Sequence, residues 1–84
     1  MLLAGVQIRD ALVLELAILL RRGNFADTAD TLEGAVAALQ PVVALTISDR
    51  VAILNVLDNP PAGLEDLRAT LLAEHVGRER GDVA

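Results

Sequence analysis

The sequence has no cysteine, lysine, tryptophan or tyrosine, and it has one phenylalanine, one histidine and one serine. The lack of cysteine excludes a disulfide framework and any zinc site built on thiolates. The lack of tryptophan and tyrosine removes most of the aromatic surface on which bases and other planar groups stack. Few side chains therefore remain for catalysis, and we expect neither a cofactor nor a bound metal.

Positive charge is also scarce. Seven arginines stand against twelve acidic residues, the formal net charge is −5, and both halves of the chain are acidic. Nucleic acids and anionic membrane surfaces attract clusters of arginine and lysine. We therefore expect neither nucleic acid nor membrane among the partners.

Apolar residues are abundant: they make up 54% of the 84 residues, which is the reverse of the composition of disordered chains. The most hydrophobic stretch, residues 1–20, is interrupted by Arg9, Asp10 and Glu15. A membrane-spanning helix needs about 20 nearly uncharged residues, and a secretory signal begins with basic residues. We therefore expect a single cytoplasmic domain over residues 1–84.

Hydrophobic spacing predicts four helices separated by short breaks, and a frayed tail over 81–84. The predicted helices cover residues 6–22, 25–40, 47–58 and 62–78. Short connections favour antiparallel neighbours. The expected fold class is all-α, a compact bundle of four short helices that assembles as a homo-oligomer.

Breaks and caps support these boundaries. Gly23 is expected to give the first helix a left-handed end, and Asn24 with Asp27 resembles a capping box for the second. Thr46 and Asp49 form a second predicted capping box, at the start of the third helix. Prolines at 41, 60 and 61 are expected to stop the second and third helices.

Two residues invite a catalytic interpretation. His75 could be a metal ligand or a general base, but one imidazole supplies only one of the three or four ligands that a metal site needs. The structural alternative is a partly buried histidine near a helix C-terminus, where a cation is favoured. Ser48 has no local base, and we expect it to bond the backbone in a first helical turn.

Carboxylates give two further candidates. Asp27, Asp30 and Glu33 fall on one side of the second predicted helix and could ligate Mg²⁺ or Ca²⁺, although we expect a solvated face. Glu15 is either a buried acid or base, or a residue of the polar side near Arg22, and helical spacing favours the second. We therefore expect no catalytic, cofactor-binding or metal-binding residue, and no enzyme.

The strongest signal is apolar surface that has no place inside one chain. A chain of this size buries only about 60% of its unfolded surface, and large exposed apolar patches mark interfaces. Aliphatic surface without aromatic anchors is typical of homo-oligomer cores. The expected interface residues lie outside the main stripe of each helix: Leu14, Ile18, Val51, Val56 and Val76.

Several segments carry a resemblance to a known group of proteins. They are Ile8–Leu12, Ala44–Arg50, Ala52–Leu54, Asn59–Leu64, Leu67–Arg68, Leu71–Leu72 and Glu74–His75. Together they resemble a group of small helical bacterial proteins of uncharacterised function. The resemblance implies a fold and no activity, because its motifs are caps, turns and core positions.

This chain departs from that group at two places. Members carry a charged residue near Val51 and a Glu-Trp pair near Val76 and Gly77. Apolar or small residues at these positions are what a natural or an engineered interface would show.

The sequence thus predicts a non-catalytic module for protein–protein interaction or self-assembly. Its partner is expected to be a second copy, giving a dimer or a higher oligomer, or another protein. The alternative is a binder of a small apolar ligand, in an aliphatic cavity between helices or at a dimer seam.

Overall fold

The computed structural model describes the backbone of residues 1–83 and the side chains of residues 1–77. This part of the chain contains four helices and three two-residue strands. The helices are α1 (Asp10–Arg22), α2 (Ala26–Ala37), α3 (Ile47–Val56) and α4 (Glu65–Val83). The strands are β1 (Leu2–Leu3), β2 (Val6–Gln7) and β3 (Val42–Val43). The four predicted helices are present, but the prediction of a purely all-α fold is wrong, because a small mixed sheet accompanies them.

The sheet has the strand order β2-β1-β3. β1 and β2 are antiparallel, and Ala4 and Gly5 between them have φ of 49° and 82°. Two consecutive residues with positive φ are the mark of the type I′ hairpin turn. β3 runs parallel to β1, with Leu2 beside Val42. Strands of two residues are too short to show an alternating pattern, which is why the sequence did not predict them.

The predicted start of the first helix at residue 6 is also wrong. Val6 pairs with Leu3 of β1, and the N–H of Ile8 donates to the carbonyl of Met1 at 2.9 Å. These backbone groups bond to the sheet, so they are not available to a helix. The chain is still extended at Arg9, and α1 begins directly after it.

α1 ends at Arg22, as predicted, but the left-handed residue that follows it is not the predicted Gly23. Asn24 has the left-handed backbone, with φ of 67°, whereas Gly23 has φ of −87°. The N–H of Phe25 then donates to the carbonyl of Leu20 at 2.8 Å, which closes a Schellman motif. Asn24 therefore does not cap α2, and the predicted capping box with Asp27 is wrong: the N-cap residue of α2 is Phe25, and no side chain caps it.

α2 ends at Ala37, before the predicted end at residue 40. Leu39 has φ of 54°, and the N–H of Gln40 donates to the carbonyl of Ala35 at 3.0 Å. The helix thus closes with a second Schellman motif, in which leucine holds the place usually given to glycine.

The remaining boundaries differ by a few residues, and the second predicted cap is present. Asp49 N–H donates to Thr46 Oγ1 and Thr46 N–H donates to Asp49 Oδ2, both at 3.1 Å, so the predicted capping box of α3 is confirmed. α4 begins at Glu65 rather than 62, after Gly63 with φ of 99°. It continues to residue 83 instead of ending at 78. The predicted frayed tail is therefore helical over 81–83, and residue 84 lies outside the described residues.

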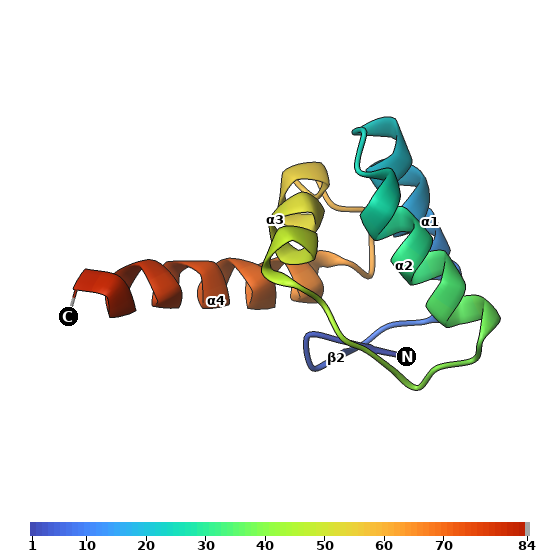
Figure 1. The fold of residues 1–84 in the computed structure, drawn as a ribbon, viewed down its shortest axis with the longest axis horizontal. Coiled ribbons are helices and arrows are strands. Elements are labelled where there is room, and N and C mark those ends of the chain that lie inside the picture. Colours follow the sequence, from blue (N-terminus) through green and yellow to red (C-terminus); the bar gives the residue numbers. More distant parts are fainter. Residues whose placement is uncertain (84) are drawn as a thin grey trace.

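Figure 1 shows α1 and α2 side by side, α3 against the N-terminal part of α4, and the rest of α4 pointing away from the body. The core between these elements is aliphatic apart from Thr28, and its largest members are fully buried. They are Leu3, Ile8, Val13, Leu16, Leu20, Leu32, Ile53, Leu57, Leu64, Leu67 and Leu71. None of the helices in the described part of the chain is long and apolar enough to cross a membrane.

Candidate interaction surface

α1 presents one continuous exposed strip to solvent. At about 100° per residue, its members share an arc of about 100° on the side away from the core. We name this strip the outer face of α1, and it consists of Ala11, Leu14, Glu15, Ile18 and Arg22. Leu14 is 40% exposed and Ile18 is 50% exposed. Two large aliphatic side chains are thus exposed to water on this face, and Ile18 lies between the Glu15 carboxylate and the Arg22 guanidinium along the helix.

A shallow hollow of about 190 Å³ lies on one flank of this face, lined by Glu15, Ile18, Leu19, Arg22 and Pro61. Glu15 and Arg22 are seven residues apart, which separates them by about 10 Å along the helix. Within the described residues, neither side chain has an ion-pair partner within 4 Å. The hollow therefore has an acidic end, a basic end and an aliphatic wall.

The other predicted interface residues lie on different helices. Val51 on α3 is 42% exposed and Val76 on α4 is 37% exposed. Val56 is partly buried and packs against the core. A Cβ built on Gly23 would lie 3.0 Å from Val56 Cγ1, so this side chain is fitted against the end of α1. Val56 therefore offers little surface to a partner.

Four further large apolar residues are exposed, and the sequence did not predict their exposure: Leu39, Val42, Ile47 and Leu72. Leu39 is seven residues after Leu32 of the buried stripe of α2, but α2 ends at Ala37, Leu39 has a left-handed backbone, and its side chain is 81% exposed. Ile47 is the first residue of α3, where its side chain projects beyond the core. No periodic signal could have found either residue, because both lie at helix ends.

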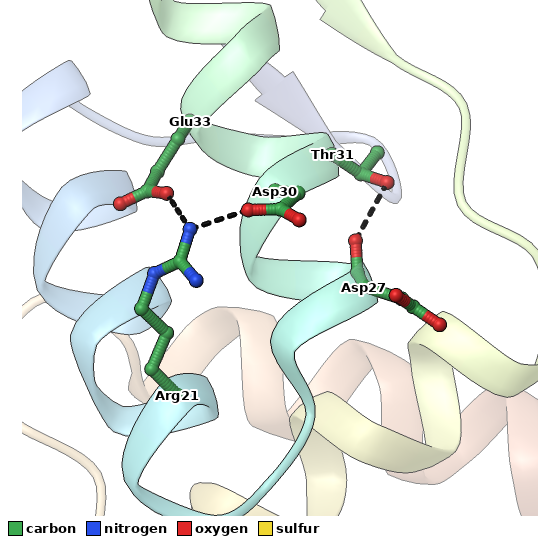
Figure 2. Close-up of polar contacts among 5 residues, drawn as sticks. All are labelled: Arg21, Asp27, Asp30, Thr31 and Glu33. Atoms are coloured by element: carbon green, nitrogen blue, oxygen red, sulfur yellow. Dashed lines mark hydrogen bonds and ion pairs between the residues drawn. The ribbon is translucent and has the colours of Figure 1, made fainter.

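The three predicted acidic residues, Asp27, Asp30 and Glu33, do not share one set of contacts in the structure. Arg21 Nη2 donates to both Asp30 and Glu33, which tie the end of α1 to α2 (Figure 2). The hydrogen bonds to Glu33 and Asp30 raise the pKa of Arg21 above its ordinary value. Asp27 points away from this group, and its carbonyl accepts a hydrogen bond from Thr31 Oγ1 (Figure 2). Two of the three carboxylates thus serve an exposed ion pair.

An open groove of about 560 Å³ lies between the N-terminal turns of α2 and α3. Thr28 Oγ1 lies in it and donates to Asp49 Oδ1 at 2.7 Å. Burial acts to raise the pKa of Asp49, but hydrogen bonds from Thr28 and Thr46 outweigh it, and the pKa lies below its ordinary value. This carboxylate therefore joins two helices as an ion.

Ser48 and His75 line two different hollows. Ser48 is exposed in the first turn of α3 and lines the groove beside α2. His75 is exposed on α4, beside a hollow of about 20 Å³ between α3 and α4, which has room for about one water molecule. Arg50 on α3 donates to Glu74 on α4 at the same contact. The two residues with catalytic potential thus line different hollows.

In the part of the chain that the structure describes, no group of three or more histidine, aspartate or glutamate residues is placed to hold a metal ion. No family model, curated protein or solved structure matches this chain. The resemblance to small helical bacterial proteins remains a prediction.

Proposed function

We propose that this chain is a non-catalytic self-association module, and that its contact surface is the outer face of α1. The observation that supports the proposal is the exposure of Leu14 and Ile18 on a helix that already buries a full stripe. That stripe consists of Val13, Leu16, Ala17 and Leu20. The core of the single chain therefore does not include the two exposed side chains.

Burying these side chains supplies the driving force. Full burial of a leucine or isoleucine side chain contributes about 1.5 to 3 kcal/mol, so covering a half-exposed one contributes about 1 kcal/mol. A two-fold contact covers four such side chains. This gain is opposed by the entropy lost on association. The four side chains supply only about 4 kcal/mol before that cost, so we expect weak association that becomes detectable toward about 1 mM.

The charges on the outer face of α1 favour a second copy of this chain as its partner. The outer face carries one acidic residue, Glu15, and one basic residue, Arg22. A partner of a single charge sign would leave one of them facing a like charge. A second copy brings both signs on the same aliphatic background, and a two-fold axis presents them in the reverse order.

Sedimentation equilibrium of wild type and Ile18→Glu tests the proposal. We expect wild-type mass to rise above 8.9 kDa with concentration, and the variant to stay at 8.9 kDa. Ile47→Glu is the matched control: it makes the same change at a residue that is 63% exposed on α3. Circular dichroism checks that both variants fold. A wild-type chain of constant 8.9 kDa mass overturns the proposal, and so does equal dissociation of the two variants.

A further inference from the structure

The inference rests on the proposed function and specifies its partner geometry. We propose that two copies pair with their α1 helices antiparallel, so that Glu15 of each copy faces Arg22 of the other. The two-fold axis then passes between Ile18 and Leu19, which are midway between the two charged residues in the sequence.

The positions of the charges around α1 select the antiparallel arrangement. With Ile18 at the centre of the outer face, Glu15 and Arg22 lie on one flank, and Leu14 lies on the other. In the antiparallel pair the two-fold axis is perpendicular to the helices. The same flank of each copy therefore lies on the same side of the contact. The flank with Glu15 and Arg22 then meets its own copy in the opposite order, and Leu14 lies on the same side of the contact as Leu14 of the second copy, next to the Arg21 ion pairs.

A parallel pair has the opposite result. Its two-fold axis runs along the helices, so opposite flanks of the two copies lie on the same side of the contact. Glu15 and Arg22 of each copy then face the Leu14 flank of the other. The charges would then lose water opposite Leu14 and the Arg21 group, whose charges are already paired with Asp30 and Glu33, which is unfavourable. Parallel helices would also align their dipoles, whereas antiparallel helices oppose them.

The register follows from the same residues. An axis near residue 16 would place the two copies of Glu15 side by side on one flank, and like charges at short range repel. An axis between Ile18 and Leu19 instead sets each Glu15 beside an Arg22. It also brings Ile18 of one copy to the hollow between Glu15 and Arg22 of the other. The hollow thus receives an aliphatic side chain at its wall and oppositely charged groups at its two ends.

Charge exchange tests this geometry. Glu15→Arg alone and Arg22→Glu alone each create two like-charge pairs, and we expect self-association to weaken about tenfold or more in each. An equimolar mixture of the two variants restores both pairs, so a heterodimer of wild-type affinity is expected. Asp58→Arg and Arg9→Glu are matched controls, since they make the same charge changes at exposed residues away from the outer face.

Cross-linking then reads the orientation directly, because the chain contains no cysteine. Glu15→Cys and Arg22→Cys chains are mixed and treated with a short bifunctional maleimide. We expect the 15-to-22 product to exceed either homodimer product about tenfold. Predominant 15-to-15 and 22-to-22 products show a parallel pair and overturn the inference.

The failure of this inference is distinct from the failure of the proposed function. If the charge variants associate as wild type does while Ile18→Glu is monomeric, the face is correct and the antiparallel pairing is wrong. If wild type itself is monomeric at every concentration, the proposed function fails, and the inference fails with it.

Discussion

Thr28 on α2 donates its hydroxyl proton to Asp49 on α3, and the two oxygen atoms are 2.7 Å apart. The other carboxylate oxygen of Asp49 accepts the N–H of Thr46, which is the N-cap residue of α3. One carboxylate therefore fixes the start of α3 and fastens it to α2. Thr28 is 5% exposed, and it is a buried polar residue in an otherwise aliphatic interior.

Replacing Thr28 with valine keeps the shape of the side chain and removes the donor. We expect Thr28→Val to lower the free energy of unfolding by about 1 kcal/mol, because a net hydrogen bond is lost. Urea unfolding at fixed protein concentration measures this change. Thr31→Val is the control, since the Thr31 hydroxyl is exposed and bonds a carbonyl of its own helix. Equal losses in the two variants would contradict the role of Thr28.

Acid should weaken this link. The pKa of Asp49 is lower in the folded protein than its ordinary value, so the ionised carboxylate stabilises the fold above the unfolded pKa. That contribution disappears as pH falls through the lower, folded value. We expect the stability difference between wild type and Asp49→Asn to be largest near neutral pH and to shrink below about pH 4. A difference that stays constant from neutral pH to acid would contradict this assignment.

The sequence predicted the helices better than it predicted where they end. Periodic leucines identify a buried stripe without knowledge of the partner helix, and Thr46 with Asp49 is a local signal that needs no tertiary contact. The sheet was missed because its strands pair residues 2 and 42, and only the folded chain brings these together. The left-handed ends of α1 and α2 fall on Asn24 and Leu39, and neither is the glycine that marks such ends in a sequence.

Leu39 occupies a backbone conformation that suits glycine. It has φ of 54° and is 81% exposed, so its side chain adds strain and little packing. We expect Leu39→Gly to raise the free energy of unfolding by about 1 kcal/mol. Asn24→Gly should gain only a few tenths, because asparagine tolerates this conformation. Thermal or urea unfolding distinguishes the two, and a loss of stability in Leu39→Gly would show that its side chain packs.

Gly63, by contrast, cannot be replaced without cost. It has φ of 99°, and a Cβ built there would lie 2.6 Å from Leu12 Cδ1. We expect Gly63→Ala to lower the free energy of unfolding by about 1 to 3 kcal/mol. Gly34→Ala is the matched control: the space around it is open within α2, and alanine there should stabilise by about 0.5 to 1 kcal/mol. A neutral Gly63→Ala would mean that the turn before α4 adjusts freely.

The candidate interface was predictable in part. Leu14 and Ile18 stand out in the sequence because they lie among polar residues of an otherwise apolar helix. The proposed pairing of Glu15 with Arg22 could not be derived in the same way, because it depends on the hollow that Pro61 completes from the loop before α4. Exposure at helix ends, as at Ile47, also depends on where each helix stops.

Sedimentation equilibrium of wild type and Ile18→Glu up to about 1 mM is the most direct test of self-association through α1. We expect a wild-type mass that rises above 8.9 kDa with concentration, and a folded variant that remains at 8.9 kDa. A wild-type mass of 8.9 kDa at every concentration would contradict it.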